Sequence, residues 1–190
     1  MRDYCHERYG WTDEVFDMVS WDTVGRVRRK LTHVKRMQTC KIMHGWLPTG
    51  HMRQFITGIN QCPGCECKDE TILHLFRCTH PRMRKKRKEI MIQFRRKGLK
   101  GKVPRHIVDA FCHVIKMECE EETKYVKRTF DSGIKEAIRE QQQIGIHLML
   151  RGFLARGWMR AIEKASSHPE RRMNTLLRLV WDTIMDPLWQ

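Results

Sequence analysis

Three cysteines and one histidine near the middle of the chain have the spacing of metal ligands. Cys62 and Cys65 are separated by Pro-Gly, and His74 and Cys78 follow, so the pattern is C-x2-C-x8-H-x3-C. Two cysteines two residues apart can hold one ion within a tight turn, which a Pro-Gly pair favours. On a helix, His74 and Cys78 would lie on one face because they are four residues apart. The sequence therefore predicts a metal site with Cys62, Cys65, His74 and Cys78 as its ligands.

Such a ligand set suits a structural zinc ion. Three thiolates and one imidazole favour zinc over magnesium or calcium, which prefer oxygen ligands. Four protein ligands close the tetrahedron and leave no position open for a substrate. Zinc binding of this kind contributes on the order of 10–16 kcal/mol to local folding. Cys67 and His80 lie two residues after Cys65 and Cys78, and either could replace one of the four ligands.

A strongly basic segment follows the last of these ligands. The chain has a net charge of +15, and residues 23–105 contain 22 basic and 4 acidic residues, a net of +18. Clustered positive charge attracts phosphate groups, although the same side chains could simply lie in solvent. A run of this kind also matches a nuclear import signal. The candidate nucleic-acid-binding residues are Arg82, Arg84, Lys85, Lys86, Arg87, Lys88, Arg95, Arg96 and Lys97.

Helices are expected to position both sets of residues. Thr12 is a candidate cap for a short helix, and Asp69 for the helix that contains His74. Pro81 and Gly98 are expected to bracket the basic helix. Apolar residues three and four apart predict one helix from Thr23 to His44, ended by Gly45, with a buried face made of Val24, Val27, Leu31, Val34 and Met37. Further helices are predicted over 105–117, over 125–143, from 144 through Ile162, and onward from Pro169.

The fold class that follows is mainly α. We expect a helical assembly with a small zinc-binding knuckle, formed by a turn or short hairpin plus a helix. Three regions are expected: an N-terminal helical region over 1–50, a zinc-binding module over 51–82, and the basic helix with a C-terminal helical bundle over 83–190.

Composition excludes several other classes. The 190 residues contain no apolar run long enough to cross a membrane, and the start lacks the apolar stretch of a signal peptide, so an intracellular protein is expected. Four of the eight cysteines fall within 62–78, which favours a metal site over a disulfide framework. No nucleophile setting and no phosphate-binding glycine loop is recognisable, so we do not expect an enzyme.

Residues 47–81 also carry a resemblance to a known family. Trp46-Leu47-Pro48-Thr49-Gly50, the cysteine pair, Asp69-Glu70-Thr71, His74-x-Phe76-x-Cys78 and Pro81 resemble the zinc-binding region of reverse transcriptases from non-LTR-type retroelements. The resemblance implies a zinc module, downstream of a polymerase domain, that assists handling of template RNA or target DNA. It makes Cys62, Cys65, His74 and Cys78 the metal ligands.

The departures from that family matter as well. Such a polymerase holds two metal ions with a paired-aspartate motif, and no Asp-Asp pair occurs in this chain. The chain therefore resembles a retroelement-derived tail segment without its polymerase.

Two functions follow as expectations. The first is a nucleic-acid-binding accessory module, in which structural zinc positions the basic helix against RNA or DNA. The alternative is a protein-interaction or scaffolding module that docks a separate polymerase or another partner. Its support is the apolar content of the C-terminal half, although we expect these side chains to pack internally: Leu148, Leu150, Phe153, Leu154, Trp158, Leu176, Leu177, Val180, Trp181, Leu188 and Trp189.

Overall fold

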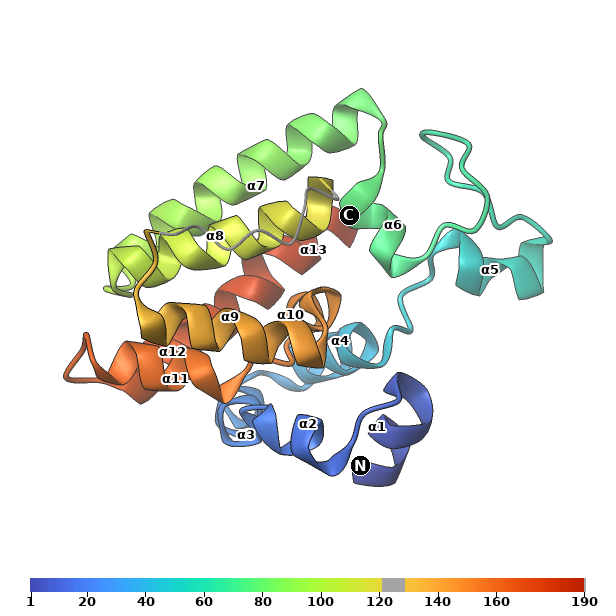
Figure 1. Cartoon of the computed structure of the whole chain (residues 1–190). Helices are drawn as coiled ribbons and strands as arrows, with labels where there is room; N and C mark the ends of the chain where they lie inside the picture. The colour runs from blue at the N-terminus through green and yellow to red at the C-terminus, as the bar shows by residue number, and fades with distance from the viewer. Residues whose placement is uncertain (121–128, 190) are drawn as a thin grey trace.

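Helices make up most of the protein, as predicted, and the computed structural model describes residues 1–120 and 129–189 (Figure 1). Within these ranges there is no strand, only an isolated bridge between Val19 and Ala155. None of the described helices is long and apolar enough to cross a membrane. The elements are α1 (Arg2–Tyr9), α2 (Asp13–Met18), α3 (Trp21–Arg29), α4 (His33–His44), α5 (Gly50–Thr57), α6 (Ile72–Arg77), α7 (Pro81–Lys100), α8 (Arg105–Glu120), α9 (Ser132–Ile144), α10 (Ile146–Arg151), α11 (Arg156–Glu163), α12 (Pro169–Leu179), the π-helical η1 (Val180–Met185) and α13 (Asp186–Trp189).

The single helix predicted from Thr23 to His44 is wrong. The structure divides it into α3 and α4, because the Thr32 hydroxyl accepts a hydrogen bond from the Lys35 backbone N–H and starts a new helix. As a result Val34 and Met37, predicted to be buried, are 74% and 52% exposed. Gly45 does end α4, in the left-handed conformation (φ 72°).

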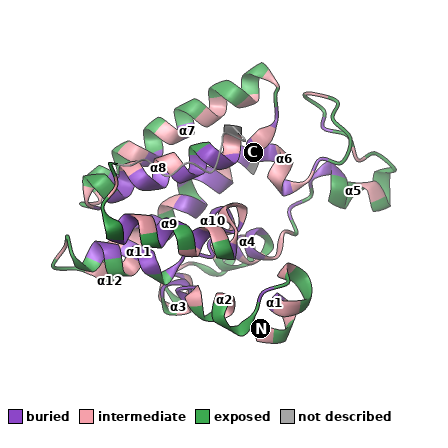
Figure 2. Ribbon diagram, viewed as in Figure 1, coloured by how far each residue is buried: buried purple, intermediate pink, exposed green. Residues whose placement is uncertain are grey.

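The basic helix α7 is longer than predicted. It continues through Gly98, where an added Cβ would lie 3.0 Å from a methyl carbon of Val108. Gly98 is therefore a point of close packing between α7 and α8, and not the end of the helix. Phe94 is fully buried and stacks on Phe111 of α8, with ring centroids 6.1 Å apart. This packing fixes which side of α7 faces solvent, as Figure 2 shows.

The C-terminal half is also more finely divided than predicted. The helix expected over 125–143 begins at Ser132 in the part described, where Asp131 caps it, and positions 125–128 of that prediction lie outside the described residues. The helix expected from 144 divides into α10 and α11 at Gly152, whose backbone has φ 106° and lies against Trp181. Pro169 does begin α12.

One hydrophobic cluster joins most of the described helices, with no member from α5. Trp158 and Trp181 are nearly inaccessible to solvent, and the Gln141 side chain bonds to the Ala155 N–H and to the Trp158 indole. All but one of the C-terminal apolar residues proposed above for docking a partner are buried, and nothing is described of the remaining side chain, Trp189. Those buried residues form the core and cannot form a docking surface.

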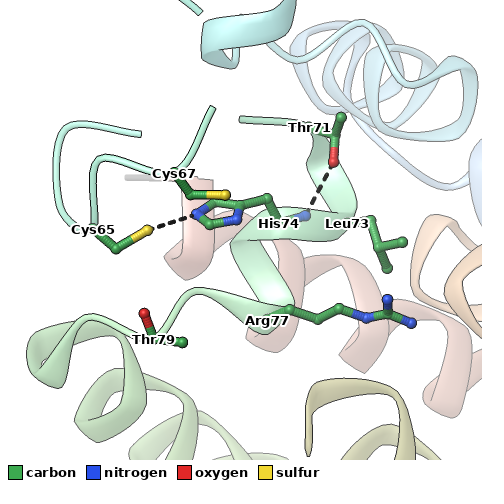
Figure 3. Close-up of a pocket in the computed structure, with 7 residues that line it drawn as sticks. All are labelled: Cys65, Cys67, Thr71, Leu73, His74, Arg77 and Thr79. Atoms are coloured by element: carbon green, nitrogen blue, oxygen red, sulfur yellow. Dashed lines mark hydrogen bonds between the residues drawn. The ribbon is translucent and has the colours of Figure 1, made fainter. Parts of the chain in front are cut away.

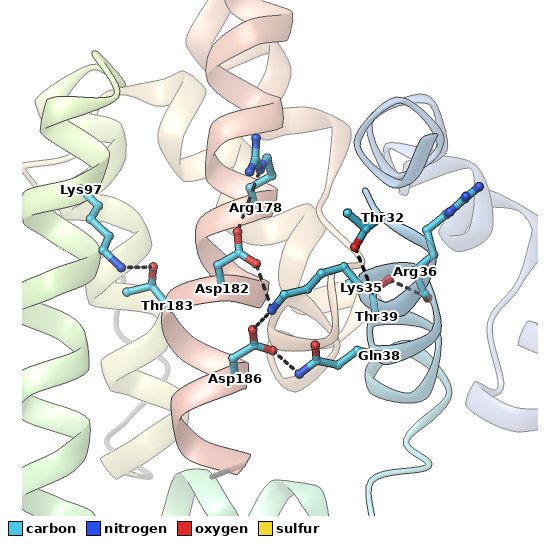
Figure 4. A network of polar contacts seen from close by, with 10 residues as sticks. All are labelled: Thr32, Lys35, Arg36, Gln38, Thr39, Lys97, Arg178, Asp182, Thr183 and Asp186. Atoms are coloured by element: carbon cyan, nitrogen blue, oxygen red, sulfur yellow. Dashed lines mark hydrogen bonds and ion pairs between the residues drawn. The ribbon is translucent and has the colours of Figure 1, made fainter. Parts of the chain in front are cut away.

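A polar network joins the end of the chain to α4 and α7 (Figure 4). Lys35 of α4 pairs with Asp186, which also accepts from the Gln38 amide at 2.8 Å. Lys97 of α7 donates to the Thr183 hydroxyl at 3.3 Å. The C-terminal helical segment therefore connects the basic helix to the N-terminal helices.

Candidate metal centre

The local sequence builds the centre from one turn and one short helix. The turn begins at Cys62, whose carbonyl accepts from the Glu66 N–H at 2.9 Å. The helix is α6, and Thr71 caps it by accepting from the His74 N–H at 3.2 Å. The predicted cap, Asp69, is wrong: it adopts a left-handed backbone (φ 66°), and its carboxylate contacts the His51 ring at 2.6 Å.

His74 is on α6, whereas Cys78 lies one residue beyond its end, where the backbone has left the helix (ψ 126°). The φ of Cys78 (−52°) is still helical, so its side chain lies on the same side of the chain as that of His74, as predicted, although Cys78 itself ends the helix.

The structure brings the four predicted ligand residues together. The four donor atoms all lie within 4.8 Å of one another. The thiol sulfurs of Cys62 and Cys78 are 3.9 Å apart, and the Cys65 sulfur is 3.3 Å from Nε2 of His74. A tetrahedral zinc ion with ordinary bond lengths requires sulfur–sulfur edges of about 3.8 Å and sulfur–nitrogen edges of about 3.6 Å. The cluster could therefore hold a metal ion such as zinc with little movement.

Cys67 and His80, the two alternative ligands, lie outside this cluster of four. Cys67 is exposed, and its thiol donates to the Lys68 carbonyl at 3.4 Å. The His80 ring covers the turn at Gly64, where an added Cβ would be 3.3 Å from the ring. Figure 3 shows Cys65, Cys67 and His74 lining a hollow beside α6, together with Thr71, Leu73, Arg77 and Thr79.

The pKa values of the Cys78 and Cys65 thiols are shifted in opposite directions. Burial raises the pKa of Cys78 to about 11. Burial also acts to raise the pKa of Cys65, but hydrogen bonds from the Cys67 backbone and from the thiols of Cys78 and Cys62 outweigh it, and that pKa is lowered. The buried side of the cluster thus holds its proton more firmly than the open side, and a metal ion must displace that proton when it binds.

Neighbouring helices hold the centre in place. Arg77 donates to the Glu118 carboxylate at 2.8 Å and to the Glu118 backbone carbonyl at 3.3 Å, and Glu118 is only 7% exposed. Arg87 of α7 donates to the carbonyl of Cys78 at 2.8 Å. The centre is therefore fastened to α8 and to the first turns of the basic helix.

The nine basic residues predicted to contact nucleic acid fall into two groups. Some are bonded or half-buried within the protein, and the others are exposed. Arg87 and Arg95 are engaged within the protein, Arg95 with Asp109 at 2.7 Å. Lys86 is half-buried, and Lys97, although exposed, bonds to Thr183. Sequence reasoning missed these internal roles because most of the partners lie on other helices. The members that are exposed and make no such bond are Arg82, Arg84, Lys85, Lys88 and Arg96.

Sequence reasoning also missed Glu70 and the helix that it holds. Glu70 is buried, and its carboxylate accepts from the Gly50 N–H at 2.7 Å at the start of α5. Its backbone also pairs with His51 and Asn60. The predictive signal was weak because residues 51–61 have no clear apolar period.

No family model, no curated protein and no solved structure matches this chain. The resemblance to retroelement reverse transcriptases therefore stays a prediction.

Proposed function

We propose that this protein is a nucleic-acid-binding accessory module, derived from a retroelement reverse transcriptase, in which a structural zinc ion orients the basic helix α7. The observation that supports it best is the position of the exposed cations. Arg82 lies four residues after Cys78, and α7 carries ten basic residues against one acidic residue, Glu89. Binding by such a surface follows charge and shape, because contacts to phosphates carry little sequence information.

Zinc has a structural role in this proposal. The three cysteines and one histidine supply four ligands, so no coordination position is open to a substrate. The ion would hold the turn at Cys62 against α6 and Cys78, and the Arg87 bond to the Cys78 carbonyl would transmit this order to α7. The proposed role is therefore non-catalytic.

The exposed cations determine the strength and the salt dependence of binding. A helix of this length spans about 30 Å, which matches several phosphates along one strand. Since some of the basic residues are engaged internally, about four phosphate contacts are expected. The logarithm of the binding constant should then fall against the logarithm of salt concentration with a slope of about −3 to −4.

A titration of the zinc-loaded chain against RNA and DNA at several salt concentrations tests the proposal. The triple substitution Lys85→Gln, Lys88→Gln and Arg96→Gln should reduce the slope and weaken binding. A matched control removes the same charge from exposed positions elsewhere, with Arg139→Gln, Lys164→Gln and Arg171→Gln. Equal losses in the two triple variants, or a slope near zero in the unsubstituted chain, would reject the proposal.

A second candidate, docking of an apolar helix from another protein, is favoured by α5. Phe55 and Ile56 are 80% and 88% exposed, and Met52 and Ile59 are exposed as well. Figure 2 shows that α5 is largely exposed. Residues 45–70 contain two basic and three acidic residues, so this surface lacks the charge that attracts phosphate. The change of Phe55 and Ile56 to serine should abolish binding of a hydrophobic dye. Unchanged dye binding would remove this candidate.

A further inference from the structure

Arginines from three different helices approach the C-terminus of α4. Arg8 of α1 donates to the carbonyl of His44 at 3.1 Å. Arg151 of α10 lies against Gly45, where an added Cβ would be 3.1 Å from Nη1 of the guanidinium. Burial lowers the pKa of His44, and the positive charges of Arg8 and of Arg28 from α3 lower it further. Figure 1 shows α1 and α10 beside α4.

These charges are not neutralised within the described part of the chain. No carboxylate there forms an ion pair with any of the three arginines. The Nε atoms of Arg28 and Arg151 are buried without a hydrogen-bond partner. Other arginines with such an atom use their remaining nitrogens, as Arg26 does with Glu170 and Arg172 with the Gly101 carbonyl. The side chains of Arg28 and Arg151 form no hydrogen bond or ion pair with residues 1–120 or 129–189.

The end of a helix does not by itself explain this arrangement. The partial negative charge at the C-terminus of α4 attracts a cation, and the Arg8 bond to His44 satisfies one carbonyl. The other two guanidiniums lie partly out of water with no counter-charge, which is unfavourable unless an anion joins them. Planar guanidiniums bind phosphate oxygens with well-directed hydrogen bonds.

An aromatic platform lies beside these charges. The Trp46 indole stacks on the His44 ring, with centroids 4.8 Å apart and planes at 24°. The His44 ring is held by the Tyr4 hydroxyl at 3.0 Å, and the Trp46 backbone N–H bonds to the Lys41 carbonyl at 2.8 Å. Although both partners are held, Trp46 remains 51% exposed. A tryptophan fixed in this way can stack on a further flat ring.

We propose that this cluster is a binding site for single-stranded nucleic acid. The guanidiniums would hold a backbone phosphate, and the indole would stack on an unpaired base. A paired base in a duplex cannot present its face in this way, so the site selects single strands. The inference rests on the proposed function and adds its substrate class. The residues of this arginine–tryptophan site are Arg8, Arg28, Arg151 and Trp46.

The test compares a labelled single-stranded oligonucleotide with a blunt duplex of equal length, both bound to the full zinc-loaded chain. Trp46→Ala should weaken binding of the single strand by about 5-fold or more and leave duplex binding unchanged, because stacking contributes to the single strand alone. Phe55→Ala, which removes another exposed aromatic ring, is the matched control and should change neither. Single-strand binding equal to that of the unsubstituted chain, or equal losses for both ligands, would overturn the inference.

The arginines are tested by removal of their charge. Arg28→Gln with Arg151→Gln should weaken single-strand binding and make its salt slope shallower by about 1 to 2 units. The control pair Arg29→Gln and Arg36→Gln removes the same charge from exposed positions of α3 and α4. Equal effects of the two pairs would contradict a specific site. If the double variant does not fold, the Trp46→Ala comparison alone decides.

The two proposals fail in different ways. If the triple variant of α7 binds like the unsubstituted chain while Trp46→Ala loses the single strand, the basic-helix proposal fails and this inference holds. If instead Trp46→Ala binds the single strand like the unsubstituted chain while the triple variant of α7 binds more weakly, the arginine–tryptophan site is rejected and the α7 proposal is supported. An unsubstituted chain that binds neither ligand rejects both.

Discussion

At the residue scale, Arg77 and Glu118 connect the candidate metal centre to the helical body. Arg77 lies one residue before Cys78, and it donates to both the side chain and the backbone of Glu118. Because the carboxylate is almost fully buried, it cannot recover these bonds from water. A comparable pair, Arg95 and Asp109, is about two-fifths exposed on both sides and serves as a reference.

The Glu118→Ala variant should therefore lose more stability than Asp109→Ala. Loss of a buried bond to a charged group costs about 2 kcal/mol, whereas an exposed pair contributes below about 1 kcal/mol. Urea denaturation of both variants measures the difference. Equal losses would mean that the Arg77–Glu118 contact does not hold the centre to α8.

A second residue-scale prediction concerns pH and His147. Burial lowers the pKa of His147, and the charges of Arg151 and Arg77 lower it further, while Glu118 opposes them. The folded state therefore favours neutral His147, so its contribution is fully present above the ordinary pKa of 6.5. As the pH falls below that value the unfolded chain takes up the proton first, and stability is lost until the folded state also binds it.

Denaturation of the unsubstituted chain and of His147→Gln between pH 5 and about pH 8 checks this sign, since His147 titrates within that range. The substitution should flatten the decline in stability on the acidic side. A decline of the same steepness in both proteins would show that His147 does not cause it.

At the element scale, α6 is short and depends on its cap. A helix of six residues has little stability of its own, and the Thr71 hydroxyl satisfies one of its first N–H groups. The cap also orients His74, whose backbone donates that bond. Thr12 caps α2 in the same manner, far along the chain from the centre.

The Thr71→Ala variant should bind zinc about 5-fold more weakly, because loss of such a cap costs about 1 kcal/mol. Thr12→Ala should lose a similar amount of global stability with no change in zinc affinity. Competition with a chelator of known affinity measures both. Loss of zinc affinity in the Thr12 variant, or none in the Thr71 variant, would contradict this role of the cap.

Taken as a whole, the molecule combines a helical body that is well packed with an attached module that is not. The body buries Phe94, Phe111, Trp158 and Trp181 in one cluster. The region of the centre adds only Leu47, Ile72 and Phe76 to that cluster.

Removal of zinc with a chelator should therefore expose backbone amides over residues 50–80 to hydrogen exchange while α8, α11 and α12 stay protected. Unchanged protection over 50–80 would show that the module folds without metal.

The sequence predicted what depends on local spacing. The mainly helical class, the grouping of the Cys and His residues and the glycine end of α4 all follow from residues close together in the chain. The sequence-based prediction failed where tertiary packing or a local cap decides the structure. Gly98 was predicted to end a helix, but it lies inside α7 and allows the close approach of Val108. Thr32 starts a new helix within what looked like one continuous apolar period. Arg87 looked like a free cation because its partner, the Cys78 carbonyl, is a backbone atom that side-chain pattern does not show.

Metal analysis of the purified chain tests the central claim most directly. The account predicts one zinc ion per chain, which Cys65→Ser lowers strongly and Cys67→Ser leaves in place, since only the first thiol lies in the cluster. A chain that carries no zinc, or one that loses it through Cys67→Ser and retains it in Cys65→Ser, would contradict the account.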